Sequence, residues 1–428
     1  MQEAQVAITP SRLTLFRTVT KASFTTLALT AAIGTSSANA LDVWVEFGSA
    51  FETGLNAATS SAGVSSFTAG ERATIEANIL SDLNTIYTGY NLAFSTSDPG
   101  GTREQINFGA TTTSGGALGV APLDFGNLSS FGGSSSSSAR VFTANFDFFI
   151  ESFEPRSQQI AEISRGLAGT GAHELLHSLG ARHYNAYSDP SITPSTYAAT
   201  GGVQNNYVIA TGSTGLGEVG RETLRTISPW SKVILDVTGG LTVFGGTPAS
   251  AVTTPIVQEF ESGDAGATLG TAQALTMTTG ETSGAEIGLV FADLDSTTSD
   301  VDLYSFTTDG PGSVTAEIWS LSRLGASFDA TLTLFDTDGT TVLLSNDNAG
   351  YSGNTFNIAS NISNDPFLLN AQLDEAGTYY LEVKATSPGS ESVGDDYFLL
   401  VGADVVPEPS SLAFLAMGGL LAARRRRG

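Results

Sequence analysis

The three histidines of this 428-residue chain all fall within one short stretch. Residues 173–183 read H-E-L-L-H-S-L-G-A-R-H, which is the pattern H-E-x-x-H-x-x-G-x-x-H. On an α-helix, residues four positions apart lie on one face, so His173 and His177 can point their rings at the same metal ion. The pattern therefore predicts a helix across the first two histidines.

The third histidine requires that this helix end before it. His183 lies six residues beyond His177, roughly 240° further around a helix, so a continuous helix would turn its ring away. Gly180 stands between them and can adopt the left-handed backbone conformation that ends a helix. We therefore expect the chain to turn at Gly180 and to bring His183 back to the same ion.

The residue types indicate a catalytic Zn²⁺ site. Three imidazole nitrogens with one coordination position left open are typical of such sites. Glu174 follows the first ligand directly, where its carboxylate can accept a proton from a water molecule that the metal activates. A lone H-E-x-x-H recurs by chance, but the glycine and the third histidine at the required offsets argue against coincidence. We predict one Zn²⁺ held by His173, His177 and His183, with Glu174 as the general base.

Residues 1–40 are expected to form an export signal peptide. Three basic residues precede an apolar stretch at 24–34, and residues 38–40 (A-N-A) fit a cleavage site. A mitochondrial transit peptide is the alternative, but the apolar run and the cleavage triplet favour export. The mature chain would then begin at Leu41.

Residues 404–428 carry a second signal. The sequence P-E-P at 407–409 precedes an apolar run at 412–423, shorter than the roughly 20 residues of a membrane span, and four arginines follow. This tail resembles the PEP-CTERM sorting signal of Gram-negative bacteria. The resemblance implies export, transient anchoring in the inner membrane and removal by an exosortase-type enzyme, with an extracellular or cell-surface location. An ordinary C-terminal anchor is the alternative.

The charge of the chain excludes one class of partner. The mature region 41–406 lacks seven of the 18 basic residues and two of the 43 acidic residues, which leaves 11 and 41, a net charge of about −30. Nucleic acid is therefore not an expected partner, because phosphate contacts need clustered lysine and arginine. The chain contains no cysteine, so it forms no disulfides.

The remaining chain is long enough for two domains. Residues 245–256, which are rich in small residues and proline, predict a linker between them. The first part, 41–244, mixes strand and helix periods, which predicts an α+β domain with the histidine helix beneath a twisted mixed sheet. The expected strands are 41–47, 91–95, 104–108 and 139–148, and the expected helices are 68–87 and 157–179.

The second part, 257–403, shows a strand pattern almost throughout. Strands are expected at 301–306, 330–335, 341–345 and 378–383, with turn residues between them. This pattern predicts an all-β sandwich domain.

The zinc motif resembles that of the metzincin metalloproteases. The sequence G-G-A-L-G-V-A-P at 115–122 is similar to the edge strand of the matrixin-type members. The resemblance implies that this strand lies over the active-site cleft and pairs with an extended peptide substrate. The substrate-binding residues would be Ala117, Leu118, Gly119, Val120 and Ala121. Val120 replaces the histidine that holds a second, structural zinc in matrixins, so the resemblance does not extend to that ion.

Metzincins also place a methionine turn beneath the metal. The best match here is T-I-S-P-W at 226–230, with Ile227 in the place of the methionine. Isoleucine can supply the same apolar floor, because no family role requires the sulfur to bind zinc. Residues 233–245 resemble the closing helix of a matrixin.

The second part resembles the bacterial pre-peptidase C-terminal domain. The likeness is carried by D-V-D-L-Y-S-F at 300–306 and G-T-Y-Y-L-E-V at 377–383. It implies a β-sandwich that accompanies a secreted protease, is often cleaved off and in some members binds Ca²⁺. Asp300, Asp302 and Asp347 are candidate Ca²⁺ ligands, with ordinary turn acids as the simpler interpretation.

These observations together predict a secreted or surface-exposed zinc metalloendopeptidase that acts on a protein or peptide substrate. One alternative is a non-catalytic extracellular-matrix or surface-binding protein built on a metalloprotease scaffold, which the sorting tail and the missing methionine favour. A zinc hydrolase of non-peptide amides is a third hypothesis, which the peptide-binding edge strand disfavours.

Overall fold

The computed structural model describes most of the two predicted domains. The described residues are 40–109, 117–122, 124, 127, 138–181, 207–210, 218–243, 249–263, 265–294, 300–320, 330–347, 365–385 and 395–405. Both predicted signals, except residues 40, 404 and 405, and the third histidine of the motif lie outside them. Among the described residues, no helix is both long and apolar enough to cross a membrane.

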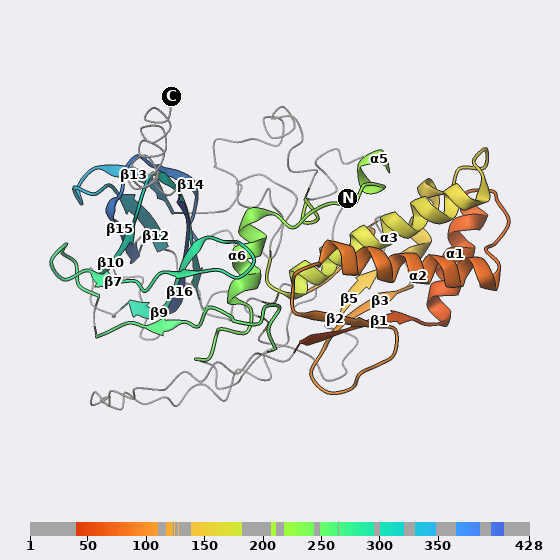
Figure 1. Ribbon diagram of the computed structural model, residues 1–428, viewed down its shortest axis with the longest axis horizontal. Coiled ribbons are helices and arrows are strands. Elements are labelled where there is room, and N and C mark those ends of the chain that lie inside the picture. The colour runs from red at the N-terminus through yellow and green to blue at the C-terminus, as the bar shows by residue number, and fades with distance from the viewer. Residues whose placement is uncertain are drawn as a thin grey trace, which may run out of the picture.

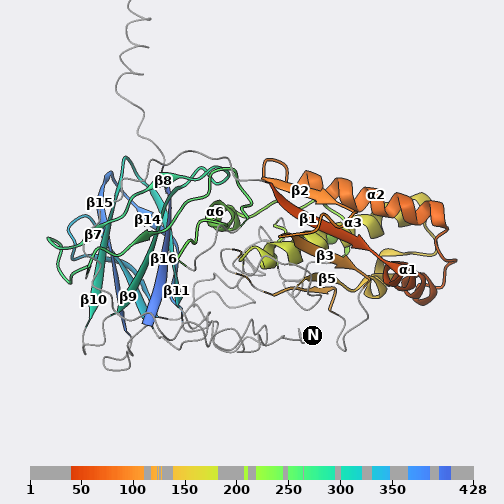
Figure 2. The ribbon, with the colours of Figure 1, turned by 90° about the horizontal axis from the view of Figure 1, so that it is seen from below.

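The first domain is built on a five-stranded mixed sheet in the order β2-β1-β3-β5-β4. The first four of these strands run parallel, and β4 pairs antiparallel with β5 at one edge. The strands are β1 Leu41–Phe47, β2 Leu92–Ser95, β3 Glu104–Phe108, β4 Gly119–Val120 and β5 Ala139–Val141. Helices α2 (Ala69–Ile86) and α3 (Arg156–Ser178) pack on one face of this sheet, with α1 (Ser49–Ser61) at its end (Figures 1 and 2).

Alternation along β1 explains which face the helices cover. Leu41, Val43 and Val45 are fully buried, whereas the residues between them are partly exposed on the opposite face. On α2, Ile75, Ile79 and Leu83 form the buried stripe expected from their spacing. The expected helix 68–87 and the expected strands 41–47, 91–95 and 104–108 lie within one residue of their observed bounds.

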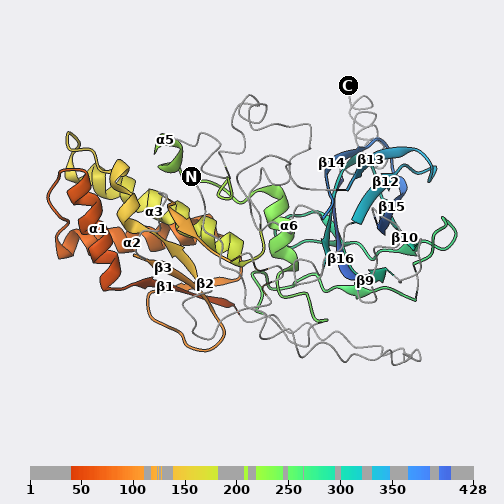
Figure 3. The same cartoon turned by 180° about the vertical axis from the view of Figure 1, so that it is seen from behind.

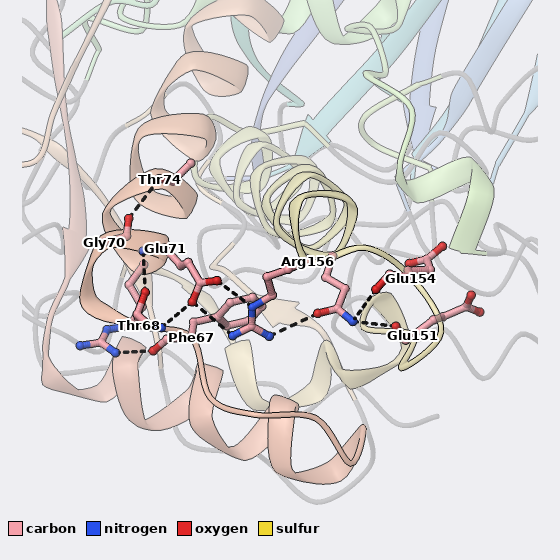
Figure 4. Close-up of polar contacts among 10 residues, drawn as sticks. Phe67, Thr68, Gly70, Glu71, Thr74, Glu151, Glu154 and Arg156 are labelled. Carbon is pink, nitrogen blue, oxygen red and sulfur yellow. Dashed lines mark hydrogen bonds and ion pairs between the residues drawn. The ribbon is translucent and has the colours of Figure 1, made fainter.

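A network of polar contacts joins the starts of α2 and α3 (Figure 4). Thr68 caps α2 in a capping box with Glu71, and the Glu71 carboxylate accepts hydrogen bonds from Arg156 at the start of α3. The Arg156 guanidinium also lies 3.9 Å from the centre of the Phe67 ring. These contacts fix the first turn of the helix that carries the histidines at its other end.

The expected strand 139–148 is wrong beyond its first three residues. The strand ends at Val141, and two 3-10 turns follow, η3 Thr143–Asn145 and η4 Asp147–Phe149. The reason is the spacing of three buried aromatic rings, Phe142, Phe146 and Phe149. Their offsets of four and three residues match a helical turn rather than the alternation of a strand.

The second domain consists of two facing sheets, β13-β12-β15-β10-β7 and β14-β11-β16-β9-β6, with β8 paired to β9 (Figure 3). The inward side chains of both sheets form one apolar core. Its longer strands agree with the expected all-β pattern. The strands are β6 Glu259–Phe260, β7 Gln273–Ala274, β8 Thr278–Thr279, β9 Glu286–Leu294, β10 Val301–Thr308, β11 Gly312–Ser320, β12 Ala330–Phe335, β13 Val342–Asn346, β14 Phe367–Leu373, β15 Gly377–Ala385 and β16 Asp395–Val405.

Two short helices of the first domain follow the histidine region, α5 (Glu218–Arg221) and α6 (Pro229–Val237). The expected closing helix at 233–245 therefore begins four residues earlier and ends eight residues sooner. Ser228 accepts a hydrogen bond from the Ser231 amide as the N-cap of α6, and Pro229 occupies the first turn, where its missing N–H costs nothing.

Helix α6 lies between the two domains (Figures 1 and 3). The Trp230 ring packs against Phe367 of β14, and its indole N–H donates to Glu317 Oε2 of β11 at 3.1 Å. The Asp236 carboxylate accepts four hydrogen bonds from the backbone amides and hydroxyls of Thr282 and Ser283. The core of the first domain therefore continues into the second.

The expected linker 245–256 is not a free connection over its described part, 249–256. Ala251 and Val252 are fully buried. The Ala251 carbonyl accepts from the Asn91 amide, and the Ile256 amide donates to the Asp236 carbonyl. The small side chains of this segment allow its backbone to pack closely against its neighbours, so they do not make the segment a flexible linker.

Candidate metal centre

The C-terminal end of α3 brings two of the three motif histidines together. His173 and His177 lie one turn apart, and their Nε2 atoms are 3.1 Å from each other. The two rings are nearly perpendicular, with 4.7 Å between their centres. Two ring nitrogens that face each other at this distance are placed to bind one metal ion.

The opposite nitrogen of each ring contacts a backbone carbonyl. His173 Nδ1 lies 2.8 Å from the Val208 oxygen, and His177 Nδ1 lies 2.7 Å from the Ala181 oxygen. A carbonyl oxygen can only accept, so each Nδ1 must carry the hydrogen, which leaves Nε2 as the nitrogen through which each ring would bind a metal. The donor set of the two rings therefore fits a metal such as Zn²⁺.

Burial keeps one of these rings neutral. It lowers the pKa of His177 to about 4 and outweighs the hydrogen bond to the Ala181 carbonyl, which by itself raises the pKa. The ring is therefore uncharged at neutral pH, which is the form that binds metals.

Gly180 ends the helix as its conformation predicts. Its φ of 96° lies in the left-handed region. The Gly180 amide donates to the His177 carbonyl and the Ala181 amide to the Leu176 carbonyl, which together form a Schellman motif. This turn also delivers the Ala181 carbonyl to the His177 ring.

The third predicted ligand, His183, lies outside the described residues, two positions beyond Ala181. The described residues hold no group of three or more His, Cys, Asp or Glu placed for a metal ion. The three-histidine site therefore stays a prediction, of which the structure provides two members in ligand geometry.

The predicted base faces the predicted edge strand. Glu174 is 5% exposed, and a Cβ added to Gly119 of β4 would lie 2.5 Å from Glu174 Oε1. Only a residue without a side chain lets the strand and the carboxylate approach this closely. Gly119 therefore lies against the carboxylate that we expect to act in catalysis.

Strand β4 is the edge of the described sheet. It pairs through Gly119 and Val120 with β5 on one side, and no described strand lies on its other side. Its neighbours in sequence are also tied down, since the Leu118 carbonyl accepts from the Phe142 amide and the Ala117 carbonyl from Asn145 Nδ2. The segment Ala117–Ala121 thus has the edge position that peptide binding requires.

The Ile227 segment is connected to the first histidine. Thr226 forms an isolated bridge with Tyr207, and the Val208 amide donates to the Thr226 carbonyl. Val208 is the residue whose carbonyl contacts His173. Ile227 itself is buried in the apolar core, as expected of a floor residue.

Three contributors to the site were not predicted from the sequence. Two are the backbone carbonyls of Val208 and Ala181, which leave no signal in a sequence. The third is Arg225, whose Nη1 lies 3.3 Å from the Val208 oxygen. Burial and, as the smaller cause, the nearby Arg221 together lower the pKa of Arg225 to about 10, so the guanidinium is still charged at neutral pH.

The candidate Ca²⁺ ligands are dispersed. Asp302 is buried in the second domain, where its carboxylate accepts a hydrogen bond from the Tyr397 hydroxyl. Asp300, Asp302 and Asp347 all belong to the described residues, in which no three carboxylates gather around one point. Calcium binding stays an untested prediction.

Comparison with known proteins identifies two parts of the chain. Residues 300–385 match the family model of the bacterial pre-peptidase C-terminal domain. Residues 405–427 match the PEP-CTERM protein-sorting motif. The second part of the chain therefore contains a pre-peptidase C-terminal domain. The sorting motif marks the protein as one exported to the cell surface of a Gram-negative bacterium and processed by an exosortase-type enzyme.

Neither of these matches reaches the first domain. No curated protein matches the chain. Among solved structures, it is similar to the pre-peptidase C-terminal domain of a collagenase from Bacillus anthracis, at 12% identity over 34% of this chain and 96% of that one, with a TM-score of 0.20. It is also similar to a family GH115 4-O-methyl-alpha-glucuronidase, at 15% identity over 59% of this chain and 30% of that one, with a TM-score of 0.17. TM-scores this low establish no shared fold.

Proposed function

We propose that this protein is an exported zinc-dependent endopeptidase of the metzincin type. The observation that carries the proposal is the pair of Nε2 atoms of His173 and His177, 3.1 Å apart, with each ring held from behind by a backbone carbonyl. Two ring nitrogens that converge in this way can bind one shared metal ion. His183 would complete the ligand set after the Gly180 turn.

The architecture around the histidines supports the metzincin resemblance. Helix α3 packs against β3, β5 and β4. An antiparallel edge strand next to Glu174 gives an extended peptide a row of backbone groups with which to pair. This arrangement favours a peptide substrate over a small amide.

The chemistry assigns a role to each group. Zn²⁺, when bound, lowers the pKa of water and polarises a carbonyl oxygen. Glu174 accepts the proton of the attacking water and passes it to the departing amine. The backbone of Ala117–Ala121 holds the peptide in line for attack. Burial of Glu174 keeps its carboxylate in a single position against Gly119.

The test is the Glu174→Gln variant. We expect it to keep its fold and its stoichiometric zinc but to lose about 100-fold or more in hydrolysis of a casein-type substrate, the scale of a general base. Glu162→Gln is the matched control, because Glu162 lies on the same helix about three turns before Glu174 and accepts a hydrogen bond from Gln158. Undiminished turnover by the Glu174→Gln variant would remove this residue from the mechanism.

A non-catalytic surface-binding protein on the same scaffold is the second candidate. Ile227 in the methionine position and the sorting motif favour it. An intact Glu174 beside two converging imidazoles favours the enzyme. A chelator that abolishes proteolysis, with recovery on adding Zn²⁺, distinguishes the two, because a binding protein would show no proteolysis before the chelator.

A further inference from the structure

Arg225 is a buried cation close to the candidate metal centre. It is 5% exposed, and none of the described carboxylates forms an ion pair with it. Its guanidinium instead donates to three backbone carbonyls. Nη1 lies 3.4 Å from the Tyr207 oxygen and 3.3 Å from the Val208 oxygen, and Nη2 lies 3.4 Å from the Gly169 oxygen.

One of these three acceptors also orients a metal ligand. The Val208 oxygen lies 2.8 Å from His173 Nδ1, so it accepts from the ring and from Arg225 at once. The position of that oxygen decides the direction of the His173 ring, because the ring can turn until its N–H meets the carbonyl. Whatever fixes Val208 therefore fixes where His173 Nε2 points.

The other contacts tie Val208 to the helix that carries the histidine. Gly169 lies on α3 one turn before His173. A Cβ added to Gly169 would be 3.2 Å from Arg225 Nη2, so the missing side chain allows the guanidinium to lie directly on the helix. Arg225 thus joins α3 to the 207–208 segment with one rigid group.

We propose that Arg225 is a positioning residue for the metal centre, which holds the Val208 carbonyl against α3 so that His173 presents Nε2 to the metal. This inference rests on the proposed zinc function. It goes beyond that function because it concerns a residue outside the motif that contacts neither metal nor substrate.

The planar guanidinium suits this role better than an ammonium group. Its donors point in fixed directions and reach carbonyls from two separate segments, whereas a lysine ammonium is a single point on a flexible stem. The positive charge itself opposes binding of a dication. Positioning and charge therefore predict opposite signs when Arg225 is removed, which makes the proposal testable.

The experiment measures Zn²⁺ affinity of the full chain by competition with a chromophoric chelator. We expect Arg225→Met to weaken binding about 10-fold or more, the usual cost of losing an outer contact of a metal ligand. Arg225→Lys keeps the positive charge but loses the planar guanidinium with its fixed donor directions, and we expect an intermediate loss of Zn²⁺ affinity. Arg103→Met is the matched control, since Arg103 is 7% exposed and its hydrogen bonds go to Asp98 and Gly101 on the loop before β3. We expect its affinity to be unchanged.

A second readout separates orientation from general loosening. The chain holds only three histidines, so its imidazole nitrogens give few NMR signals. In the zinc-free Arg225→Met variant, His173 should lose its single Nδ1–H tautomer, whereas His177 should keep its own, because its acceptor is Ala181. Loss at both rings would indicate a general collapse and would count against the proposal.

The outcomes are distinct. If the wild-type chain binds Zn²⁺ and Arg225→Met binds it equally well or more tightly, the positioning role is wrong while the proposed function stands. If the wild-type chain binds no Zn²⁺, both are wrong. If Arg225→Met does not fold, the Zn²⁺ affinity of the Arg225→Lys variant decides. Wild-type affinity in that variant would refute the positioning role of the guanidinium.

Discussion

Helices α3 and α6 both belong to the first domain, but different contacts hold them in place. The end of α3 is held by backbone groups of its own domain, the carbonyls of Val208 and Ala181 that contact the histidine rings. Helix α6 is held by side chains that reach into the second domain, from Trp230 to Glu317 and from Asp236 to Thr282. The first arrangement aims side chains, and the second joins two domains.

The contacts of α6 show that the second domain, which contains the pre-peptidase C-terminal domain, helps to bury apolar side chains of the first domain. Its outer sheet face covers Trp230 and neighbouring apolar residues of α6, which would otherwise face water. Helix α6 begins two residues after Ile227, which directly follows the residue whose carbonyl accepts from the Val208 amide. We therefore expect loss of the second domain to change the packing of α6 and of the Ile227 segment, close to the candidate metal centre.

The strongest test of the contact between α6 and the second domain is the Trp230→Ala variant. We expect a loss of about 3–5 kcal/mol in the free energy of unfolding, because a large buried ring and its hydrogen bond to Glu317 are both removed. Urea unfolding followed by tryptophan fluorescence and circular dichroism measures it. Phe153→Ala is the control, since Phe153 is 81% exposed. Two separate transitions in the wild-type chain would show that the domains are independent.

The Gly119→Ala variant tests the candidate metal centre without changing the contact between the two domains. The added methyl group would overlap Glu174 and displace its carboxylate. We expect kcat/KM for a peptide substrate to fall about 100-fold, the scale of a misplacement of 1 Å, with little change in Tm. An active variant would show that Glu174 is free to move or is not needed.

The Glu71 contact at the opposite end of α3 predicts a pH dependence (Figure 4). Hydrogen bonds from Arg156 and then from the Thr68 amide lower the pKa of Glu71 from 4.5 to about 2. Its stabilising contribution is therefore complete above pH 4.5 and is lost as the pH falls towards 2. We expect Glu71→Gln to cost about 1 kcal/mol at neutral pH and the difference from wild type to shrink across this range, as measured by urea unfolding at each pH. A difference that is constant with pH would contradict this assignment.

The smallest expected effect is that of Ile227→Met. The two side chains have similar volumes, and such exchanges in a core usually cost less than about 1.5 kcal/mol. We expect proteolysis and zinc affinity to stay within about twofold of wild type, since the floor needs an apolar side chain rather than sulfur. A large gain in activity would show that the isoleucine impairs the enzyme.

Local patterns predicted most elements of the fold. The alternation in β1 and the stripe on α2 come from neighbours in the chain, and their bounds agree with the structure within a few residues. Prediction failed where long-range packing decided the outcome. The stretch after Val141 turns into 3-10 helix because three phenylalanine rings at helical spacing are buried, and part of 249–256 is buried against both domains.

The glycines of α3 illustrate the same limit. In the sequence Gly166 and Gly171 only weaken the expected helix. In the structure, a Cβ on Gly166 would lie 2.6 Å from the Phe149 ring, and one on Gly171 would lie 2.7 Å from the Phe108 ring. The helix tolerates them because tertiary packing against these rings offsets their low propensity.

The sequence alone predicted the chemistry of the candidate site. The types and offsets of His173, Glu174, His177 and Gly180 follow from helix geometry, which depends only on residues a few positions apart. Only the tertiary structure decided what aims those side chains. Val208 lies 35 residues after His173 and Arg225 lies 56 residues after Gly169, and hydrogen bonds over such separations arise from the packing of the whole domain, to which no local pattern points.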